Sequence, residues 1–202
     1  SLTVDSLQAL REYIALKFPN YPAAALTYEN APVQSERTQY TRRRLNEIDI
    51  KREKYERTKQ STQIGSKLSL KLPSITEEEI SLSDLKSKFI FVDIWASWCK
   101  PCRAQIPYIK EVLKKYPNDI KIYAVSIDIG HNTWRNAIEK DQTQEFIHVI
   151  GTDQDRRNVR SVEVLGIERI PRNFLLDRNC RIIAKDLHDE QLMQTLDSLT
   201  KQ

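Results

Sequence analysis

The stretch from Phe89 to Cys102 constrains the fold of this chain more than any other feature. It begins with a continuous apolar run, Phe89 to Val92, which is typical of a strand buried on both faces of a sheet. It ends in Cys99-Lys100-Pro101-Cys102, where the pattern predicts the start of a helix that runs to about Lys115 with a kink at Pro107. A central strand that leads into a helix at a cysteine indicates an α/β fold with a thiol at the strand end.

The position of Cys99 at a helix start favours a reactive thiolate. Unpaired backbone N–H groups and the positive end of the helix dipole face a group at this position, and both stabilise the thiolate over the thiol. Cys102 lies one helical turn further on, within disulfide reach of Cys99. A Cys-x-x-Cys pair in a strand–helix context therefore predicts thiol redox chemistry.

The rest of the second part of the chain alternates strands with helices. Strands are expected at residues 68–72, 80–82, 89–92, 120–127 and 146–150, and as a hairpin at 174–176 and 181–183. Helices are expected at residues 133–140, 155–164 and 190–199, and Trp134 is interpreted as a packing residue. This order predicts an α/β sandwich with a mixed sheet.

The first part of the chain has a different character. A helix is expected from Leu7 to Phe18, and a long polar helix over residues 36–59, which hold nine basic and five acidic residues. A solvated helix face explains this charge better than nucleic-acid binding, because the stretch carries no nucleic-acid motif. Gly65 marks the boundary, so we expect an N-terminal helical segment, 1–63, and a second domain, 64–202.

Two motifs give the second domain a family resemblance. The sequence Trp95-Ala96-Ser97-Trp98-Cys99-Lys100-Pro101-Cys102 resembles the active site of thioredoxins, and in particular that of the TlpA/ResA-like redoxins, which are bacterial envelope disulfide reductases. The sequence Gly166-Ile167-Glu168-Arg169-Ile170-Pro171, followed by Phe174 to Asp177, resembles the cis-proline loop of the same family and its next strand. The resemblance covers roughly Ile64 to Gln202 and implies a thioredoxin fold, a mixed central sheet flanked by helices.

The resemblance also implies roles for individual residues. Cys99 is the implied attacking cysteine and Cys102 the buried resolving cysteine. Pro171 is expected to be cis and to place the Ile170 backbone beside the disulfide, where an extended substrate adds as a strand. The candidate substrate-binding residues are Trp98, Lys100, Pro101, Ile170, Pro171 and Arg172.

Two side chains bear on the proton that Cys102 must lose. Gln105 stands where many relatives of this kind carry a glutamate near the cysteines, and a glutamine cannot accept a proton. Asp93 stands where thioredoxin has its buried acid, and strand alternation puts it on the same face as Trp95. Burial should raise the pKa of Asp93 toward neutrality, so Asp93 is the candidate general base; the alternative is a carboxylate satisfied by a hydrogen bond.

Several charged residues and one further cysteine lie near these motifs. Lys100, Arg103, Arg169 and Arg172 are expected to make the site electropositive and to favour acidic partner surfaces, although Arg172 also fits a solvated surface charge. Cys180 occupies a predicted hairpin turn, so we expect an exposed bystander thiol there.

The residues favour a disulfide reductase, and three alternatives remain. The pair needs no cofactor, only a disulfide-containing protein substrate and an upstream thiol reductase, membrane-bound or soluble. The alternatives are a disulfide oxidase or isomerase with the same site, a partner-binding module with a vestigial redox site, and a peroxiredoxin-type peroxidase, whose Thr-x-x-Cys motif is absent at Cys99. One Cys-x-x-Cys and three scattered histidines are too few ligands to favour a metal site.

The resemblance alone implies a periplasmic or cell-envelope location. No apolar run reaches the ~18 residues that a membrane-spanning helix needs. Ser1 stands where a start methionine is usual, so a removed leader or a membrane tether outside this chain stays open.

Overall fold

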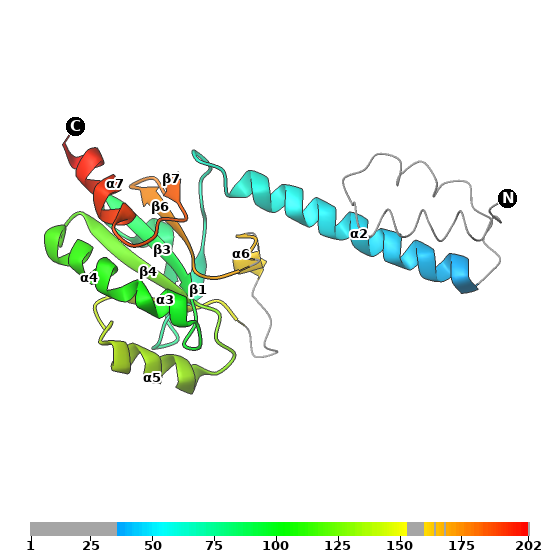
Figure 1. Ribbon diagram of the computed structural model, residues 1–202, viewed down its shortest axis with the longest axis horizontal. Coiled ribbons are helices and arrows are strands. Elements are labelled where there is room, and N and C mark those ends of the chain that lie inside the picture. Colours follow the sequence, from blue (N-terminus) through cyan, green and yellow to red (C-terminus); the bar gives the residue numbers. More distant parts are fainter. Residues whose placement is uncertain (1–35, 153–159, 164, 168, 202) are drawn as a thin grey trace. The chain divides into compact units, whose positions relative to one another are not determined.

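A five-stranded mixed sheet organises the second part of the chain (Figure 1). The computed structural model describes residues 36–152, 160–163, 165–167 and 169–201. The strand order is β5-β4-β3-β6-β7, with β3 parallel to β4, β4 parallel to β5, and β6 antiparallel to both β3 and β7. The strands are β3 (Phe89–Trp95), β4 (Ile120–Ser126), β5 (Ile147–Ile150), β6 (Arg172–Asp177) and β7 (Ile182–Lys185). This arrangement confirms the mixed sheet that the sequence predicts.

The central strand β3 is buried along its whole length and separates two apolar clusters. Phe91 and Trp95 belong to the first cluster, together with both active-site cysteines. Ile90 and Ile94 point to the opposite face and belong to the second cluster. Because side chains alternate along a strand, a continuous apolar run supplies both clusters.

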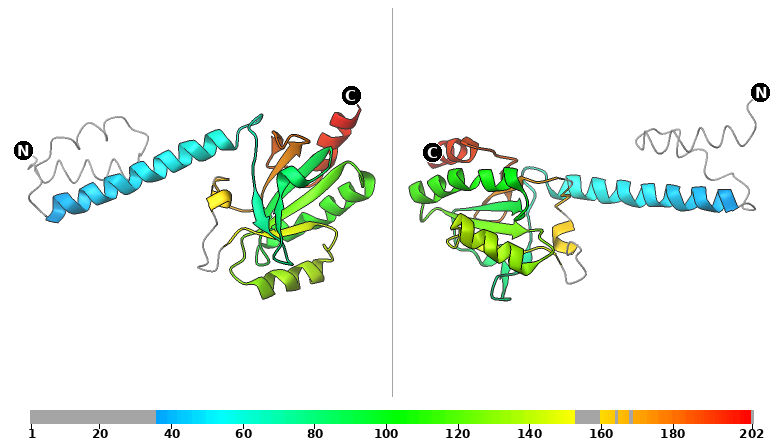
Figure 2. Two further views of the ribbon diagram at one scale, coloured as in Figure 1. Left: turned by 180° about the vertical axis from the view of Figure 1, so that it is seen from behind. Right: turned by 60° about the horizontal axis from the view of Figure 1, so that its bottom comes forward.

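Four helices supply the first cluster: α3 (Lys100–Ala104), α4 (Ile106–Lys115), α5 (His131–Asp141) and α7 (Gln191–Thr200) (Figures 1 and 2). The helix expected from Cys99 to Lys115 is divided at Gln105, which caps both α3 and α4. The break lies two residues before Pro107, because proline has no N–H to continue the ladder of the preceding turn. Trp134 of α5 is fully buried, which agrees with its interpretation as a packing residue.

Short elements and extended chain cover the second cluster. These are β1 (Lys71–Pro73), β2 (Glu79–Ser81), the short 3-10 helix η2 (Leu82–Asp84) and α6 (Arg160–Glu163). Leu68, Leu70 and Leu72 are all buried, as their alternation predicts, yet only Lys71–Pro73 forms a strand, paired with β2. Of the helix expected over residues 155–164, α6 is the described part, and the remainder lies outside the described residues.

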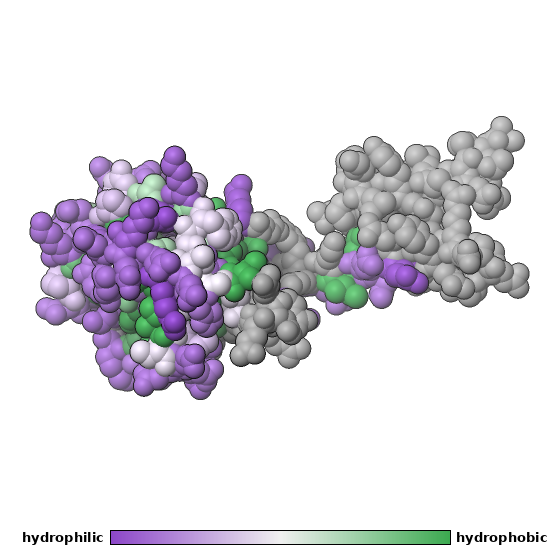
Figure 3. Space-filling view, turned by 90° about the horizontal axis from the view of Figure 1, so that it is seen from below, coloured by the Kyte–Doolittle hydropathy of each residue, from purple (hydrophilic) through white to green (hydrophobic). Residues whose placement is uncertain are grey.

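The chain divides into two compact units, Ser1–Arg57 and Thr58–Gln202. The helix expected over residues 36–59 is part of α2 (Glu36–Ser61), most of which belongs to the first unit. The helix expected from Leu7 to Phe18 lies outside the described residues. Within the described residues, no helix combines the length and apolar character of a membrane span. The face drawn in Figure 3 is mostly hydrophilic, with small apolar patches.

The last turn of α2 packs within the second unit. Thr58 and Thr62 are both buried, and the Thr62 carbonyl accepts a hydrogen bond of 3.2 Å from Lys185 Nζ. Thr58 also lies against the backbone of Gly166, where an added Cβ would come within 1.9 Å of Thr58 Cγ2. Gly166 has a φ of +56°, so both its conformation and its close neighbour require glycine. These contacts begin at Thr58, earlier than the boundary expected at Gly65.

The expectation that Cys180 is an exposed turn cysteine is wrong. Cys180 lies in the turn between β6 and β7 with a φ of 60°, but only 4% of it is exposed. Its carbonyl accepts a 2.8 Å hydrogen bond from Leu68 N, so the segment that precedes β1 covers the turn. Burial raises the pKa of the Cys180 thiol above its usual value, which makes it less reactive.

Cys180 should therefore resist thiol reagents in the native state. When Cys99 and Cys102 are joined as a disulfide, Ellman's reagent should detect almost no thiol in the folded protein and one thiol in denaturant. Rapid labelling of the folded, oxidised protein would show that the turn opens readily, and a Cys180→Ser variant would identify the labelled residue.

The contacts of Thr58 and Thr62 predict the stability of two fragments. A fragment 58–202 and a fragment 64–202 should both fold, since each keeps the whole sheet and both clusters. The longer fragment should be more stable by roughly 1–3 kcal/mol, because it retains two buried threonines and the bond from Lys185. Urea unfolding measures the difference. Equal stabilities would place the boundary near Gly65, and failure of both fragments to fold would refute the division.

Candidate active site

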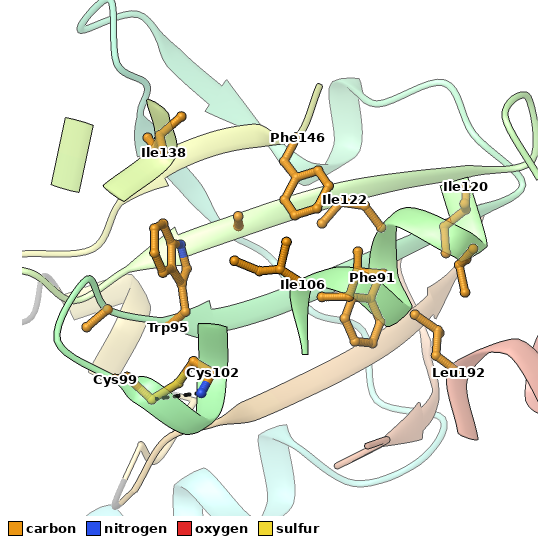
Figure 4. Close-up of a cluster of buried hydrophobic side chains, with 14 of the residues drawn as sticks. Phe91, Trp95, Cys99, Cys102, Ile106, Ile120, Ile122, Ile138, Phe146 and Leu192 are labelled. Atoms are coloured by element: carbon orange, nitrogen blue, oxygen red, sulfur yellow. Dashed lines mark hydrogen bonds between the residues drawn. A yellow bond between two sulfur atoms is a disulfide. The ribbon is translucent and has the colours of Figure 1, made fainter. Parts of the chain in front are cut away.

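Cys99 and Cys102 meet at the carboxyl end of β3, where they form a disulfide with Cα atoms 5.3 Å apart. The strand ends at Trp95, and a hydrogen bond of 3.0 Å from Cys99 N to Ala96 O closes the turn that follows. Lys100 then begins α3. Figure 4 shows the disulfide at one end of the first apolar cluster, beside Trp95.

Cys99 is the N-cap residue of α3, and its sulfur acts as the cap. Cys99 Sγ accepts a hydrogen bond of 3.2 Å from the backbone N–H of Cys102, drawn as a dashed line in Figure 4. This donor favours a negative sulfur over a neutral one once the disulfide is reduced. Cys102 occupies the first turn of the helix, and its own backbone N–H donates to Cys99 Sγ.

The two cysteines do not differ in exposure as expected. In the oxidised state Cys99 is 4% exposed and Cys102 is 2% exposed, so the disulfide leaves little of either residue open to solvent. The feature that distinguishes them is the N-cap position of Cys99. Trp98, in contrast, is 66% exposed, and Lys100 and Pro101 are exposed as well.

The loop before β6 brings three candidate residues to the same edge of the sheet. The Ile170–Pro171 peptide bond is cis, the geometry that the family resemblance implies. Ile170 packs against both apolar clusters and is only partly buried. Arg172 opens β6 opposite Ile94, and its guanidinium carbon lies 5.2 Å from the centre of the Phe174 ring. Phe174 belongs to the second cluster, so Arg172 faces away from the side of the sheet that holds the cysteines.

Arg103 does not remain a free cation beside the site. Its Nη2 lies 2.6 Å from Asp141 Oδ1 and its Nε 2.7 Å from Asp141 Oδ2, a bidentate pair. The charge of Arg103 is thus largely neutralised, and the hydrogen bond to Asp141 raises the pKa of the guanidinium. Of the four cations that the sequence singles out, Lys100 and Arg169 are exposed and Arg172 is half-buried, and none of these three forms an ion pair with a described residue.

Asp93 lies on the face of β3 that holds the cysteines, with 7% of it exposed. No hydrogen bond joins its side chain to another of the described residues. Burial raises the pKa of this carboxyl to about 7. It lines a cavity of about 10 Å³, the room that about one water needs. Gln105, Asn173 and Asp189 line the same cavity.

Gln105 closes this cavity toward the loop before α7. Its Oε1 accepts a 2.6 Å hydrogen bond from the backbone N–H of Asp189, and its Nε2 donates to Asp189 Oδ1 at 3.1 Å. The structure therefore brings Asp93 and Gln105 together around one small polar space, although they come from a strand and a helix junction.

Sequence reasoning missed two buried polar residues near the cysteines. His148 of β5 lies 5.8 Å from Trp95 between ring centres, and burial lowers its pKa to about 4, so it is neutral at pH 7. Asp128 is 1% exposed and bonds to Ser97, two residues before Cys99. The sequence did carry a signal for Asp128, because this acid follows a predicted central strand. The carboxyl ends of neighbouring parallel strands meet at one edge of a sheet, so an acid there comes close to the cysteines.

The described residues offer no metal site. Among them, no three His, Cys, Asp or Glu side chains come together as ligands.

Comparisons with known proteins agree with this geometry. Residues 63–201 match the model of the Redoxin family. The thiol-disulfide oxidoreductase ResA of Bacillus cereus is 25% identical over 147 residues, which cover 70% of this chain and 82% of ResA.

Two solved structures from Bacteroides show the same fold. The thioredoxin domain of a thiol-disulfide oxidoreductase from Bacteroides vulgatus is 28% identical with a TM-score of 0.63, over 69% of this chain and 99% of that domain. A thiol:disulfide interchange protein from Bacteroides sp. is also 28% identical, with a TM-score of 0.62, over 70% of this chain and 93% of its own. The chain therefore belongs to the Redoxin family and is a TlpA/ResA-like thiol-disulfide oxidoreductase with a thioredoxin fold, in which Cys99 and Cys102 form the disulfide.

Proposed function

We propose that this protein reduces disulfide bonds in protein substrates and that Cys99 is its attacking residue. The Cys99 thiolate attacks one sulfur of the substrate disulfide, forms a mixed disulfide and releases the other substrate sulfur as a thiolate. The Cys102 thiolate then attacks Cys99 Sγ, which frees the second substrate sulfur and leaves the Cys99–Cys102 disulfide. Two electrons pass from the dithiol to the substrate, and an upstream thiol reductase returns them.

The observation that carries the assignment of Cys99 as the attacking residue is the hydrogen bond from Cys102 N to Cys99 Sγ, 3.2 Å long; the direction, reduction, rests on the family resemblance. The hydrogen bond stabilises a thiolate on Cys99, while Cys102 has no comparable donor among the described residues. The nucleophile therefore stands at the helix start, and the resolving sulfur follows it one turn later.

The docking surface we propose for the substrate consists of Trp98, Lys100, Pro101, Ile170 and Pro171. Trp98 supplies exposed apolar area, and the Ile170 backbone offers its polar groups to an extended segment. Lys100 and Arg169 add positive charge that no described acid neutralises, which favours acidic partner surfaces. Arg172 contributes to the same field from the opposite face of the sheet and does not lie against the disulfide.

The upstream reductase and the location follow from the family resemblance. A TlpA/ResA-like redoxin works in the bacterial envelope with a membrane-bound or soluble thiol reductase, and we propose the same here.

Cysteine substitutions test the roles within the pair. Cys99→Ser should abolish reduction of a model protein disulfide, because the nucleophile is gone. Cys102→Ser should instead accumulate a mixed disulfide with the substrate, which mass spectrometry detects, and Cys180→Ser should turn over like the unmodified protein. Near-normal turnover by Cys99→Ser would refute the assignment. The direction is tested separately in glutathione buffers: a potential near about −270 mV supports a reductase, and one near about −120 mV an oxidase.

Asp93 is the base that we propose for the resolving step. Cys102 is 2% exposed, and burial disfavours a thiolate, so the resolving step needs a proton acceptor. The pKa of Asp93, about 7, suits that task at neutral pH. The shared cavity puts Gln105 beside Asp93, at the position where relatives carry a glutamate. A base at either position would therefore face the same small cavity.

Asp93→Asn should slow resolution of a preformed mixed disulfide by roughly a hundredfold and remove a rate increase through pH about 7. Gln105→Glu should restore part of the rate in that variant, since both side chains line one cavity. Stopped-flow resolution across pH measures both effects. Glu190→Gln, an exposed neighbour outside the cavity, is the control. An unchanged profile in Asp93→Asn would eliminate Asp93 as the base.

Asp93→Asn should slow the resolving step but stabilise the folded protein at neutral pH. Because the folded pKa of Asp93 lies above its unfolded value, the folded state keeps a proton that the unfolded state releases, and stability falls as pH rises from about 4 to about 7. At pH 8, Asp93→Asn should raise the free energy of unfolding by as much as about 4 kcal/mol, with little change at pH 4. An Asp93→Asn variant that is destabilised equally at pH 4 and pH 8 would contradict the claim that the Asp93 charge is buried without compensation.

A further inference from the structure

Asp128 lies at the same edge of the sheet as the cysteines and takes no part in the reaction described above. β4 ends at Ser126, which stands opposite Trp95 of β3 in parallel register. Both strands end at this point, and the segments that follow lead from β3 to Cys99 and from β4 to Asp128. Asp128 is 1% exposed, so its carboxylate is enclosed beside the loop that carries the nucleophile.

The carboxylate of Asp128 binds that loop at Ser97. Its Oδ2 accepts hydrogen bonds of 2.8 Å from Ser97 N and 2.8 Å from Ser126 Oγ, and its Oδ1 accepts one of 2.6 Å from Ser97 Oγ. Arg103 Nη1 donates to the Ser97 carbonyl at 3.3 Å. Every polar group of Ser97 is therefore held, and Cys99 follows only two residues later.

The carboxylate of Asp128 is well supplied with hydrogen-bond donors. Three donors, one of them a backbone N–H, compensate the burial of its oxygens. No described cation forms an ion pair with it, because the nearby Arg103 is engaged with Asp141 at 2.6 Å. A buried negative charge thus stands beside the turn on which the Cys99 thiolate must form.

The other charged groups around Cys99 do not cancel this charge. Lys100 and Arg169 are exposed and screened by solvent, Arg172 lies on the opposite face of the sheet, and Arg103 and Asp141 neutralise each other. Asp93, on the strand behind the cysteines, is either neutral or a second negative charge, depending on pH. Asp128 is the buried acid hydrogen-bonded to the active-site loop.

We propose that Asp128 is a positioning residue that fixes the loop before Cys99 and whose negative charge disfavours the Cys99 thiolate, so that the dithiol is a stronger electron donor. The oxidised pair carries no charge, whereas the reduced pair carries a thiolate at neutral pH. A fixed negative charge therefore destabilises the reduced form relative to the disulfide. This inference rests on the proposed reductase function and names a residue that sets its driving force.

The test compares reduction equilibria of the full chain in glutathione buffers. Asp128→Asn keeps an acceptor for Ser97 N and removes the charge, so the equilibrium should shift about tenfold toward the dithiol, which corresponds to about 30 mV. The Cys99 thiolate, followed by its ultraviolet absorbance, should form at lower pH in this variant. Ser97→Ala removes one donor and leaves the charge less compensated, so it should shift the equilibrium about twofold toward the disulfide.

Asp177→Asn is the matched control. Asp177 accepts hydrogen bonds from Asn179 N and Arg181 N in a turn, as Asp128 does in its loop, but it stands opposite Phe89 at the other end of β3. This variant should leave both the equilibrium and the Cys99 titration unchanged. A shift of equal size in Asp177→Asn would attribute the effect to general destabilisation and overturn the inference.

The remaining outcomes separate the inference from the proposed function. The role of the charge would be overturned by an unchanged equilibrium in Asp128→Asn. It would also be overturned by a shift toward the dithiol in Ser97→Ala. Ser97→Ala provides the test if Asp128→Asn does not fold. A strongly oxidising potential in the unmodified protein would refute the reductase proposal by itself. In that case the tenfold shift in Asp128→Asn would still show that Asp128 sets the potential.

Discussion

Parallel pairing of β3 with β4 brings two loop segments to one edge of the sheet. Trp95 stands opposite Ser126, and the segments after these two residues contain Cys99 and Asp128. Because parallel neighbours end at the same edge, residues 31 apart in sequence meet as Ser97 and Asp128, with bonds as short as 2.6 Å. The position of the redox pair therefore depends on this one register: a slip by one residue would turn Trp95 to the other face and separate the bonded groups.

The same strand explains why an acid can lie inside the sheet. Asp93 occupies the face of β3 that Phe91 and Trp95 also use, so its carboxylate is buried next to the cluster that holds the disulfide. A fully apolar residue there would make the domain more stable at neutral pH, since burial raises the pKa of Asp93 to about 7. Asp93 shares its small cavity with Gln105, and the role proposed for Asp93 as the base of the resolving step would give this loss of stability a function.

Local patterns in the sequence predicted most of the elements and the reactive pair. The apolar run of β3, the hairpin of β6 and β7, and the helix start at Cys99 depend on neighbours in sequence, which periodicity and capping describe well. Family resemblance, rather than periodicity, supplied the role of the Ile170–Pro171 loop. No local pattern marks the contact between Thr58 and Gly166, because the two residues lie more than a hundred positions apart in the sequence.

Features that depend on distant contacts could not be predicted. The predicted hairpin turn at Cys180 suggested exposure, but the chain before β1 bonds across this turn at Leu68. Arg103 looked like an unpaired active-site cation until α5 placed Asp141 against it. Gln105 looked like a simple loss of a base, and only the fold shows that it shares a cavity with Asp93.

Cys99 is subject to two opposite electrostatic influences that arise from adjacent parts of one loop. The N–H of Cys102 stabilises negative charge on Cys99 Sγ through a direct contact of 3.2 Å. The carboxylate of Asp128 opposes that charge from behind Ser97, at longer range but in an enclosed environment where screening is weak. Fixed dipoles make the sulfur reactive, while the fixed charge limits how far the reduced state is stabilised. A site with only the first influence would ionise readily but would be a poor electron donor, because a very stable thiolate holds its electrons.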